Sequence, residues 1–200
     1  VLTKAELLSV EDFLSNPSGP QRDRILAGFL LFCVYGRLRV GDATRISSEP
    51  VLDVSSTGEG YIESGMLEHK TSSRVKSRLV LPVAATAVGV GGTHWAEVWL
   101  ALRKAAGLDA AVSKTLMQAP GLEGSWTAKR LPTSECTTWL RELLRQVTGA
   151  EGARAAGLGS HSLKATMLSW VAKFGLPAGP RRRLGGHVKS GDRSLVEDSR

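Results

Sequence analysis

The sequence contains little cysteine and no long apolar run. Its two cysteines, Cys33 and Cys136, both fall within apolar helical patterns, which indicates buried, reduced thiols rather than a disulfide framework. No segment approaches the roughly 18 apolar residues of a membrane span, and no signal peptide is visible. We therefore expect an intracellular protein without a membrane partner, nuclear if the organism is eukaryotic.

Two further absences concern bound ligands. The four histidines and two cysteines are not spaced as zinc ligands are. No glycine-rich phosphate-binding motif of a nucleotide site occurs either. We therefore expect neither a metal nor a small-molecule cofactor.

Acidic residues are absent from two long stretches. None occurs from His69 to Ala96 or from Gly152 to Gly191, and the second stretch carries seven lysines and arginines. One-sided charge of this kind repels itself unless a polyanion is close. The whole chain has a formal net charge of +7 and a pI of about 9.8. These values favour nucleic acid or an anionic surface as the partner; a protein that is merely basic is the alternative.

Hydrophobic periodicity predicts most of the secondary structure. With 200 residues, 42% of them hydrophobic, the chain can bury one core, so we expect a single domain over residues 1–200. Apolar spacing predicts helices over 4–15, 21–35, 93–106, 134–148 and 162–174, with shorter ones at 181–184 and from about 192. The helix over 21–35 should be mostly buried. Asp42 is expected to be the N-cap of a short helix that continues to Ile46.

Strand-like patterns occur only in the first half of the chain. They cover residues 51–54, 60–70 and 75–83, the last two as a hairpin around 71–73 that Pro82 closes. Residues 108–133 have little pattern and predict a long connection, and residues 150–158 predict a small flexible segment. The expected fold class is α+β, mostly helical, with a small antiparallel sheet of about three strands.

Four short motifs follow one another along this framework. They are Arg37-Leu-Arg39-Val-Gly-Asp42 after the buried helix, Lys70-Thr71 on the hairpin, His161-Ser-Leu-Lys164 at a helix start, and Leu184-Gly-Gly-His187. In this order they resemble the catalytic domain of the tyrosine recombinase (phage integrase) family, especially recombinases of eukaryotic mobile elements. The resemblance covers roughly residues 20–200. Two departures are Lys164, where the family has arginine, and the extra glycine before His187.

The resemblance implies a phosphodiester-binding site that acts in DNA recombination or integration. It implies that Arg39, His161, Lys164 and His187 surround the scissile phosphate, where fixed cations and N–H donors stabilise the developing negative charge without a metal. It further implies that Lys70 protonates the leaving hydroxyl. Asp42 would orient these residues without contacting the phosphate itself.

The nucleophile is the largest departure from the family. A tyrosine would attack the phosphate and form a covalent phosphotyrosine, but Asp198 stands at the expected position. The only tyrosines, Tyr35 and Tyr61, lie far upstream and are predicted to be packing residues. We expect DNA affinity to persist and strand cleavage to be weak or absent, unless a tyrosine lies beyond Arg200 or comes from another subunit.

Further basic residues are candidates for DNA contacts. They are Arg74, Lys76 and Arg78 on the hairpin, and Arg181, Arg182, Arg183 and Lys189 in the last part of the chain. Lys76 competes with Lys70 for the catalytic position on the hairpin. The resemblance also allows assembly as a homo-oligomer on DNA.

Two other interpretations of the chain stay open. One is a non-catalytic DNA-binding relic of a mobile element, which Asp198 favours. The other is an unrelated basic helical binding module, which applies if the motif residues do not converge in space. The resemblance also implies an N-terminal DNA-clamping domain, for which residues 1–20 are too short. The start at Val1 rather than Met suggests a fragment or a processed product, and we expect the C-terminus to be truncated.

Overall fold

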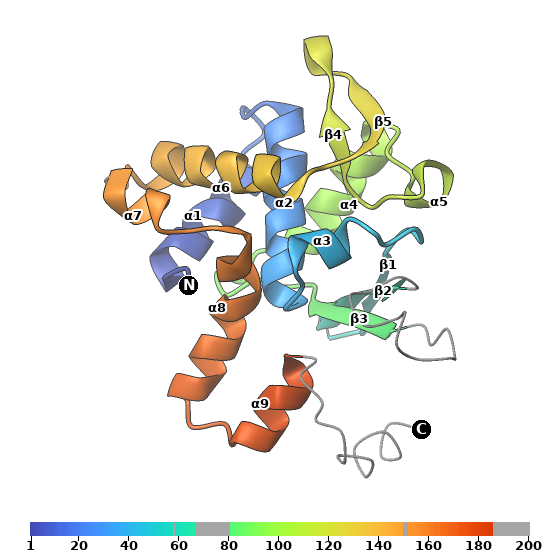
Figure 1. Ribbon diagram of the computed structural model, residues 1–200. Helices are drawn as coiled ribbons and strands as arrows, with labels where there is room; N and C mark the ends of the chain where they lie inside the picture. Colours follow the sequence, from blue (N-terminus) through green and yellow to red (C-terminus); the bar gives the residue numbers. More distant parts are fainter. Residues whose placement is uncertain (58, 67–80, 150–151, 186–200) are drawn as a thin grey trace.

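The computed structural model describes residues 1–57, 59–66, 81–149 and 152–185 (Figure 1). Its helices are α1 (Lys4–Ser15), α2 (Gln21–Tyr35), α3 (Val40–Ala43), α4 (Trp95–Ala105), α5 (Ala110–Ser113), α6 (Thr133–Thr148), α7 (Gly152–Ala156), α8 (Ser160–Lys173) and α9 (Ala178–Leu184). Its strands are β1 (Val51–Val54), β2 (Gly60–Met66), β3 (Leu81–Thr86), β4 (Gln118–Pro120) and β5 (Trp126–Arg130). The α+β class and the predominance of helix are confirmed.

Helix α2 lies at the centre of the molecule, and its eleven residues from Ile25 to Tyr35 are all buried. Helices α1, α4 and α8 pack around it (Figure 1). The contact with α4 is especially close, because a Cβ on Gly28 would lie 2.1 Å from a ring carbon of Trp99. The Trp99 indole also donates to the Ile25 carbonyl at 2.9 Å. The prediction of a buried helix over 21–35 is confirmed.

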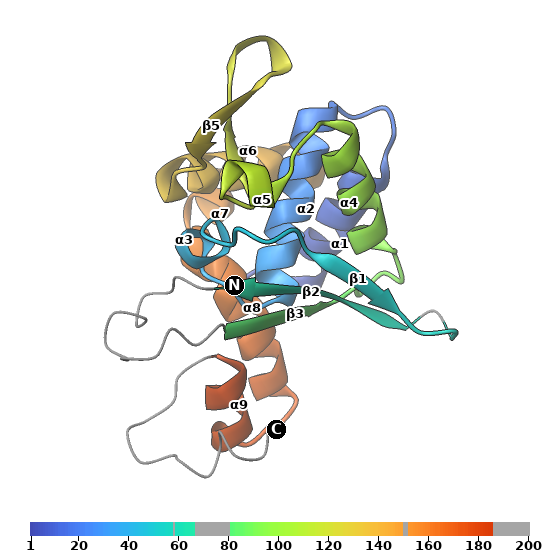
Figure 2. The same cartoon turned by 90° about the vertical axis from the view of Figure 1, so that its right-hand side faces the viewer.

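The main sheet is antiparallel, in the order β1-β2-β3. Leu52 pairs with Ile62, and Ile62 pairs in turn with Ala85. Ile62, Val83 and Ala85 are buried, and β3 contacts α2. Figure 2 shows this sheet beside α2, at some distance from the second, smaller hairpin of β4 and β5. The predicted three-stranded antiparallel sheet is confirmed.

Pro82 does not close its strand, so that prediction is wrong. It pairs with Gly65, and β3 continues to Thr86. Among the described residues, β3 pairs only with β2 and is an edge strand, where a proline is tolerated because its missing N–H need not serve a second neighbour. The predicted turn around 71–73 lies outside the described residues.

Three other local predictions are also wrong. Residues 108–133 contain α5 and the β4–β5 hairpin rather than a patternless connection. Residues 152–156 form α7, held to α1 by Arg154, whose guanidinium donates to Glu6 at 3.0 Å. Asp42 lies inside α3, and Arg39 occupies the N-cap position. A tertiary contact therefore stabilises α7, which apolar spacing could not reveal.

Both cysteines are buried and free, as predicted. Burial raises the pKa of Cys136 to about 12. Burial, and then the charge of Cys136, raises the pKa of Cys33 well above its usual value. Neither thiol is activated as a nucleophile.

A buried carboxylate joins α1, α2 and the loop before α4. Glu11 is fully buried and accepts hydrogen bonds from the Tyr35 hydroxyl, from the Thr93 hydroxyl, and from the backbone N–H groups of Val90 and Gly91 at 3.1 Å each. The network satisfies a charge that would otherwise be costly to bury. It fixes the C-terminal end of α2, from which the site described below begins.

Removal of this carboxylate should destabilise the fold strongly. Glu11→Ala removes the acceptor of the buried Tyr35 hydroxyl and of the part-buried hydrogen bonds from Thr93 and Gly91, and we expect a loss of about 3–5 kcal/mol in the free energy of unfolding. Chemical denaturation monitored by tryptophan fluorescence measures it. Asp12→Ala, on the exposed face of the same helix, is the matched control and should change stability by less than about 0.5 kcal/mol. Equal effects of the two variants would contradict the assignment.

Candidate functional site

The chain leaves the buried helix α2 through a tight turn that presents Arg39. Arg37 has a positive φ of 54°, and the Leu38 N–H donates to the Cys33 carbonyl at 2.8 Å. Leu38 and Val40 are both buried. Because they flank Arg39 and point inward, the Arg39 side chain is directed to the surface, where it is 36% exposed.

Asp42 pairs with Arg39 from the first turn of α3. The distance from Asp42 Oδ2 to Arg39 Nη1 is 3.6 Å, and the Asp42 side chain is only 12% exposed. A carboxylate at this distance restricts the orientation of the guanidinium. Asp42 therefore positions Arg39 and leaves part of its N–H fork available to another acceptor.

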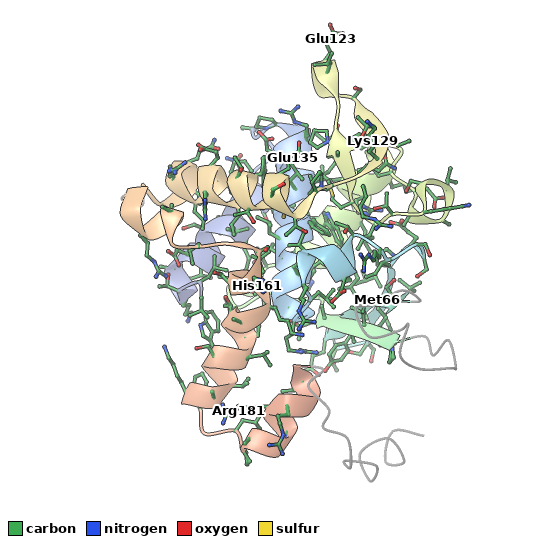
Figure 3. The ribbon with its side chains drawn as sticks, in the orientation of Figure 1. Met66, Glu123, Lys129, Glu135, His161 and Arg181 are labelled. Carbon is green, nitrogen blue, oxygen red and sulfur yellow. The ribbon has the colours of Figure 1, made fainter. Side chains whose placement is uncertain are left out.

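The first turns of α8 present His161 and Lys164 on one face. Leu163 and Thr166 are buried on the other face, and the Thr166 hydroxyl accepts a hydrogen bond from the Leu2 N–H at 3.0 Å. Residues three apart on a helix are neighbours, so the anchoring of one face places the two basic residues together. Figure 3 shows His161 at the first turn of α8, at the end of the helix that faces α3 and α6.

The two segments meet at a cavity of about 270 Å³. Its lining residues are Arg39, Val40, Gly41, Asp42, Arg45, Thr133, Ser160 and His161. We call this the Arg39–His161 cavity. Thr133 closes one side, since a Cβ on Gly41 would lie 3.6 Å from its hydroxyl. Of the described side chains that line it, three are basic and one is a carboxylate, which favours an anionic ligand.

The N-terminal end of α8, which carries a partial positive charge, also lines the cavity. Its N-cap is Gly159, which supplies no side-chain oxygen to the first turn. The first N–H groups of a helix have no intrahelical partner, and two residues that carry such groups, Ser160 and His161, line the cavity. Together with Arg39, they suit a phosphate or a similar oxyanion.

Lys164 lies beside this cavity in an environment that disfavours its charge. Burial lowers its pKa first, and the positive charges of Arg39 and Arg37 lower it further. The carboxylate of Asp42 acts in the opposite direction. An anion bound between Lys164 and Arg39 would relieve both the repulsion and part of the desolvation.

Arg37 has a structural role next to the site. Its Nε donates to the Leu184 carbonyl at 3.3 Å, and its Nη1 donates to the Tyr35 carbonyl at 3.2 Å. It thereby ties the end of α9 to the end of α2. Burial lowers the pKa of its guanidinium.

Arg181 and Arg182 of α9 do not line the Arg39–His161 cavity. Arg182 is exposed, whereas Arg181 is half-buried with its Nε buried and without a hydrogen-bond partner. Among the described side chains, no hydrogen bond or ion pair joins either residue to the cavity. The side chain of Arg183 lies outside the described part of the structure.

Several predicted site residues cannot be placed. Lys70, Arg74, Lys76, Arg78, His187, Lys189 and Asp198 all lie outside the described residues. The prediction that Tyr35 is a packing residue is confirmed, because it is buried and donates to Glu11; its burial and the Glu11 carboxylate raise its pKa. Tyr61 is 53% exposed, so the packing role predicted for it is wrong.

The sequence interpretation missed three lining residues. Arg45 follows α3 and is exposed at the edge of the cavity, while Thr133 and Ser160 begin α6 and α8. No motif marks Arg45, because its place depends on the short helix α3 turning it back toward Arg39. The sequence does not reveal Thr133 for a similar reason, since this residue reaches the cavity through the packing of α6 against α3.

No family model matches the chain, and no curated protein matches it. Among the residues that the structure describes, no group of three His, Cys, Asp or Glu side chains is arranged to hold a metal ion. No helix in the same part of the chain is long and apolar enough to cross a membrane. The arrangement of basic side chains around the Arg39–His161 cavity is therefore the main evidence about function.

The electrostatics of Lys164 predict a pH-dependent gain in stability when its charge is removed. Its folded-state pKa is lowered, so the unfolded chain binds this proton more tightly and the charged lysine destabilises the fold at neutral pH. The penalty disappears as the pH rises past the unfolded value of about 10.4. Lys164→Met should therefore be more stable than the wild type at neutral pH, by a margin that shrinks at alkaline pH.

Denaturant unfolding across this pH range measures the margin. Lys173→Met, an exposed lysine on the same helix, is the control and should change stability by less than about 0.5 kcal/mol. A margin for Lys164→Met that is constant with pH would indicate a purely hydrophobic effect and would contradict the electrostatic explanation.

Proposed function

We propose that this chain is a DNA-binding domain of the tyrosine recombinase type, built for DNA integration or recombination, with strand cleavage impaired by Asp198. The observation that carries the proposal is the convergence of Arg39, Asp42, His161 and Lys164 at one site. Two motifs separated by about 120 positions in the sequence supply these residues. An unrelated basic module would have no reason to bring them together.

The geometry suits a phosphodiester group. Arg39 offers a planar pair of N–H donors, and the first turn of α8 offers backbone N–H groups next to the His161 imidazole. Lys164 adds a point charge rather than the fork of an arginine. In an in-line displacement at phosphorus, such donors would stabilise the charge on the non-bridging oxygens.

The role of Asp42 is to position Arg39 rather than to contact the ligand. Its carboxylate is largely buried and 3.6 Å from the guanidinium, and a carboxylate aimed at a phosphate would repel it. Loss of Asp42 should therefore weaken DNA binding through Arg39. This agrees with the role that the sequence resemblance implied for it.

A non-catalytic DNA-binding relic is the second candidate, and Asp198 is the feature that favours it. An aspartate at the nucleophile position would face the phosphate with like charge and offers no stable covalent link. Both candidates require DNA binding at the same cavity. They differ only in whether the site can still support cleavage once a tyrosine is supplied.

DNA binding should depend steeply on salt and on Arg39. Each phosphate neutralised by the protein contributes about −0.9 to the slope of log K against log salt concentration. Arg39→Ala should weaken binding to duplex DNA roughly tenfold and reduce that slope by about 1. Fluorescence anisotropy measures both quantities. Arg22→Ala, a partly exposed arginine at the start of α2 paired with Asp23, is the control and should bind normally; affinity that is insensitive to salt would contradict the proposal.

A nicked suicide DNA substrate separates the two candidates. We expect no covalent adduct with the native chain and an adduct with Asp198→Tyr, detected on a denaturing gel. The double variant Asp198→Tyr/Lys164→Arg should form it faster, because the arginine fork holds two phosphate oxygens. Binding without adduct in both variants would favour the relic. An adduct with the native chain would show that the explanation based on Asp198 is wrong.

A further inference from the structure

The β4–β5 hairpin projects from the body of the molecule and carries unpaired positive charge. Figures 1 and 2 show its tip standing clear of the helices, and Figure 3 shows Lys129 on β5 and Glu123 at the tip. Lys129 and Arg130 are exposed. Among the described residues, neither side chain forms a hydrogen bond or an ion pair. From Ser113 to Ser134, Glu123 is the one acidic residue, against three basic ones.

The base of the hairpin is fixed to the same short helix that presents Arg39. The buried Thr115 hydroxyl donates to the Thr44 carbonyl, at the end of α3, at 2.6 Å. The Leu131 N–H donates to the Met117 carbonyl at 2.9 Å and closes the base. The hairpin therefore has a defined position relative to the Arg39–His161 cavity.

The charged residues of β5 lie close to that cavity along the chain. Thr133, which lines the cavity, follows Arg130 by three residues in the sequence. An extended chain spans at most about 3.5 Å per residue, so their Cα atoms are within about 10 Å of each other. This distance corresponds to about three base pairs, because the phosphates of one strand are spaced about 3.4 Å apart along the duplex axis.

We propose that Lys129 and Arg130 bind the phosphate backbone of duplex DNA that flanks the site. Successive strand residues point to opposite faces, so the two cations flank the hairpin on both sides. A two-stranded ribbon of this kind is narrow enough to enter the major groove. This inference rests on the proposed function, since it assumes that DNA occupies the Arg39–His161 cavity.

The test compares two duplexes and a charge-removing variant. The wild type should bind a duplex of about 20 base pairs, which reaches the hairpin, more tightly than a duplex of about 4 base pairs closed by a short loop, which covers the cavity without extending the roughly three base pairs to Arg130. Lys129→Ala/Arg130→Ala should bind the long duplex roughly tenfold more weakly, with a salt slope smaller by about 2, and should bind the short one as the wild type does. Lys129→Arg/Arg130→Lys, which keeps both charges, should bind like the wild type.

Controls separate failure of this inference from failure of the proposed function. Lys4→Ala/Arg22→Ala removes two exposed charges elsewhere and should leave binding to both duplexes unchanged. Circular dichroism should show that the hairpin variant keeps its fold, as expected for exposed side chains. Normal binding of both duplexes by the hairpin variant would overturn the inference alone, whereas a wild type that binds neither duplex would overturn the proposed function as well.

Discussion

The complete burial of α2 is the constraint on which the rest of the structure depends. A helix without an exposed face over eleven residues must be covered on every side, and α1, α4, α8 and β3 supply that cover. The chain can return to the surface only after Tyr35, whose hydroxyl is held by Glu11. Arg37 and Arg39 are the first charged residues after this point. The core thus determines where the first cation of the site appears.

The charges of the site destabilise the fold. Lys164 is half-buried beside Arg39 and Arg37, and a single carboxylate, Asp42, offsets the repulsion among them. The packing of Leu163 and Thr166 against the interior holds Lys164 in place despite this repulsion. A cluster of like charges maintained by the fold is expected where an anion binds, because a charge partner from outside completes the electrostatics. Since exchange of Lys164 for a neutral residue should raise the stability of the free protein, a structural role alone does not explain the cluster.

Much of the fold was predictable because the main helices have apolar periodicity over three or more turns, as α6 does. The β4–β5 hairpin was not, because strands of three and five residues interrupted by Pro120 and Gly121 show no alternation. Motif order identified Arg39, His161 and Lys164 as neighbours. It could not identify Arg45, whose position depends on a four-residue helix. It also missed the buried role of Arg103, because a count of basic residues does not distinguish buried from exposed side chains.

Arg103 connects the core to the hairpin and therefore to the site. It is buried, donates to both carboxylate oxygens of Glu49 at 2.9 Å, and donates to the Leu116 carbonyl just before β4. Its guanidinium also lies over the Trp99 ring, 5.2 Å from the centroid. Since Thr115 in turn bonds to the end of α3, the hairpin base and the Arg39 helix are held by one continuous set of buried contacts. A ligand that touches both would not have to order them on binding, and such preorganisation favours affinity for an extended polyanion over a small one.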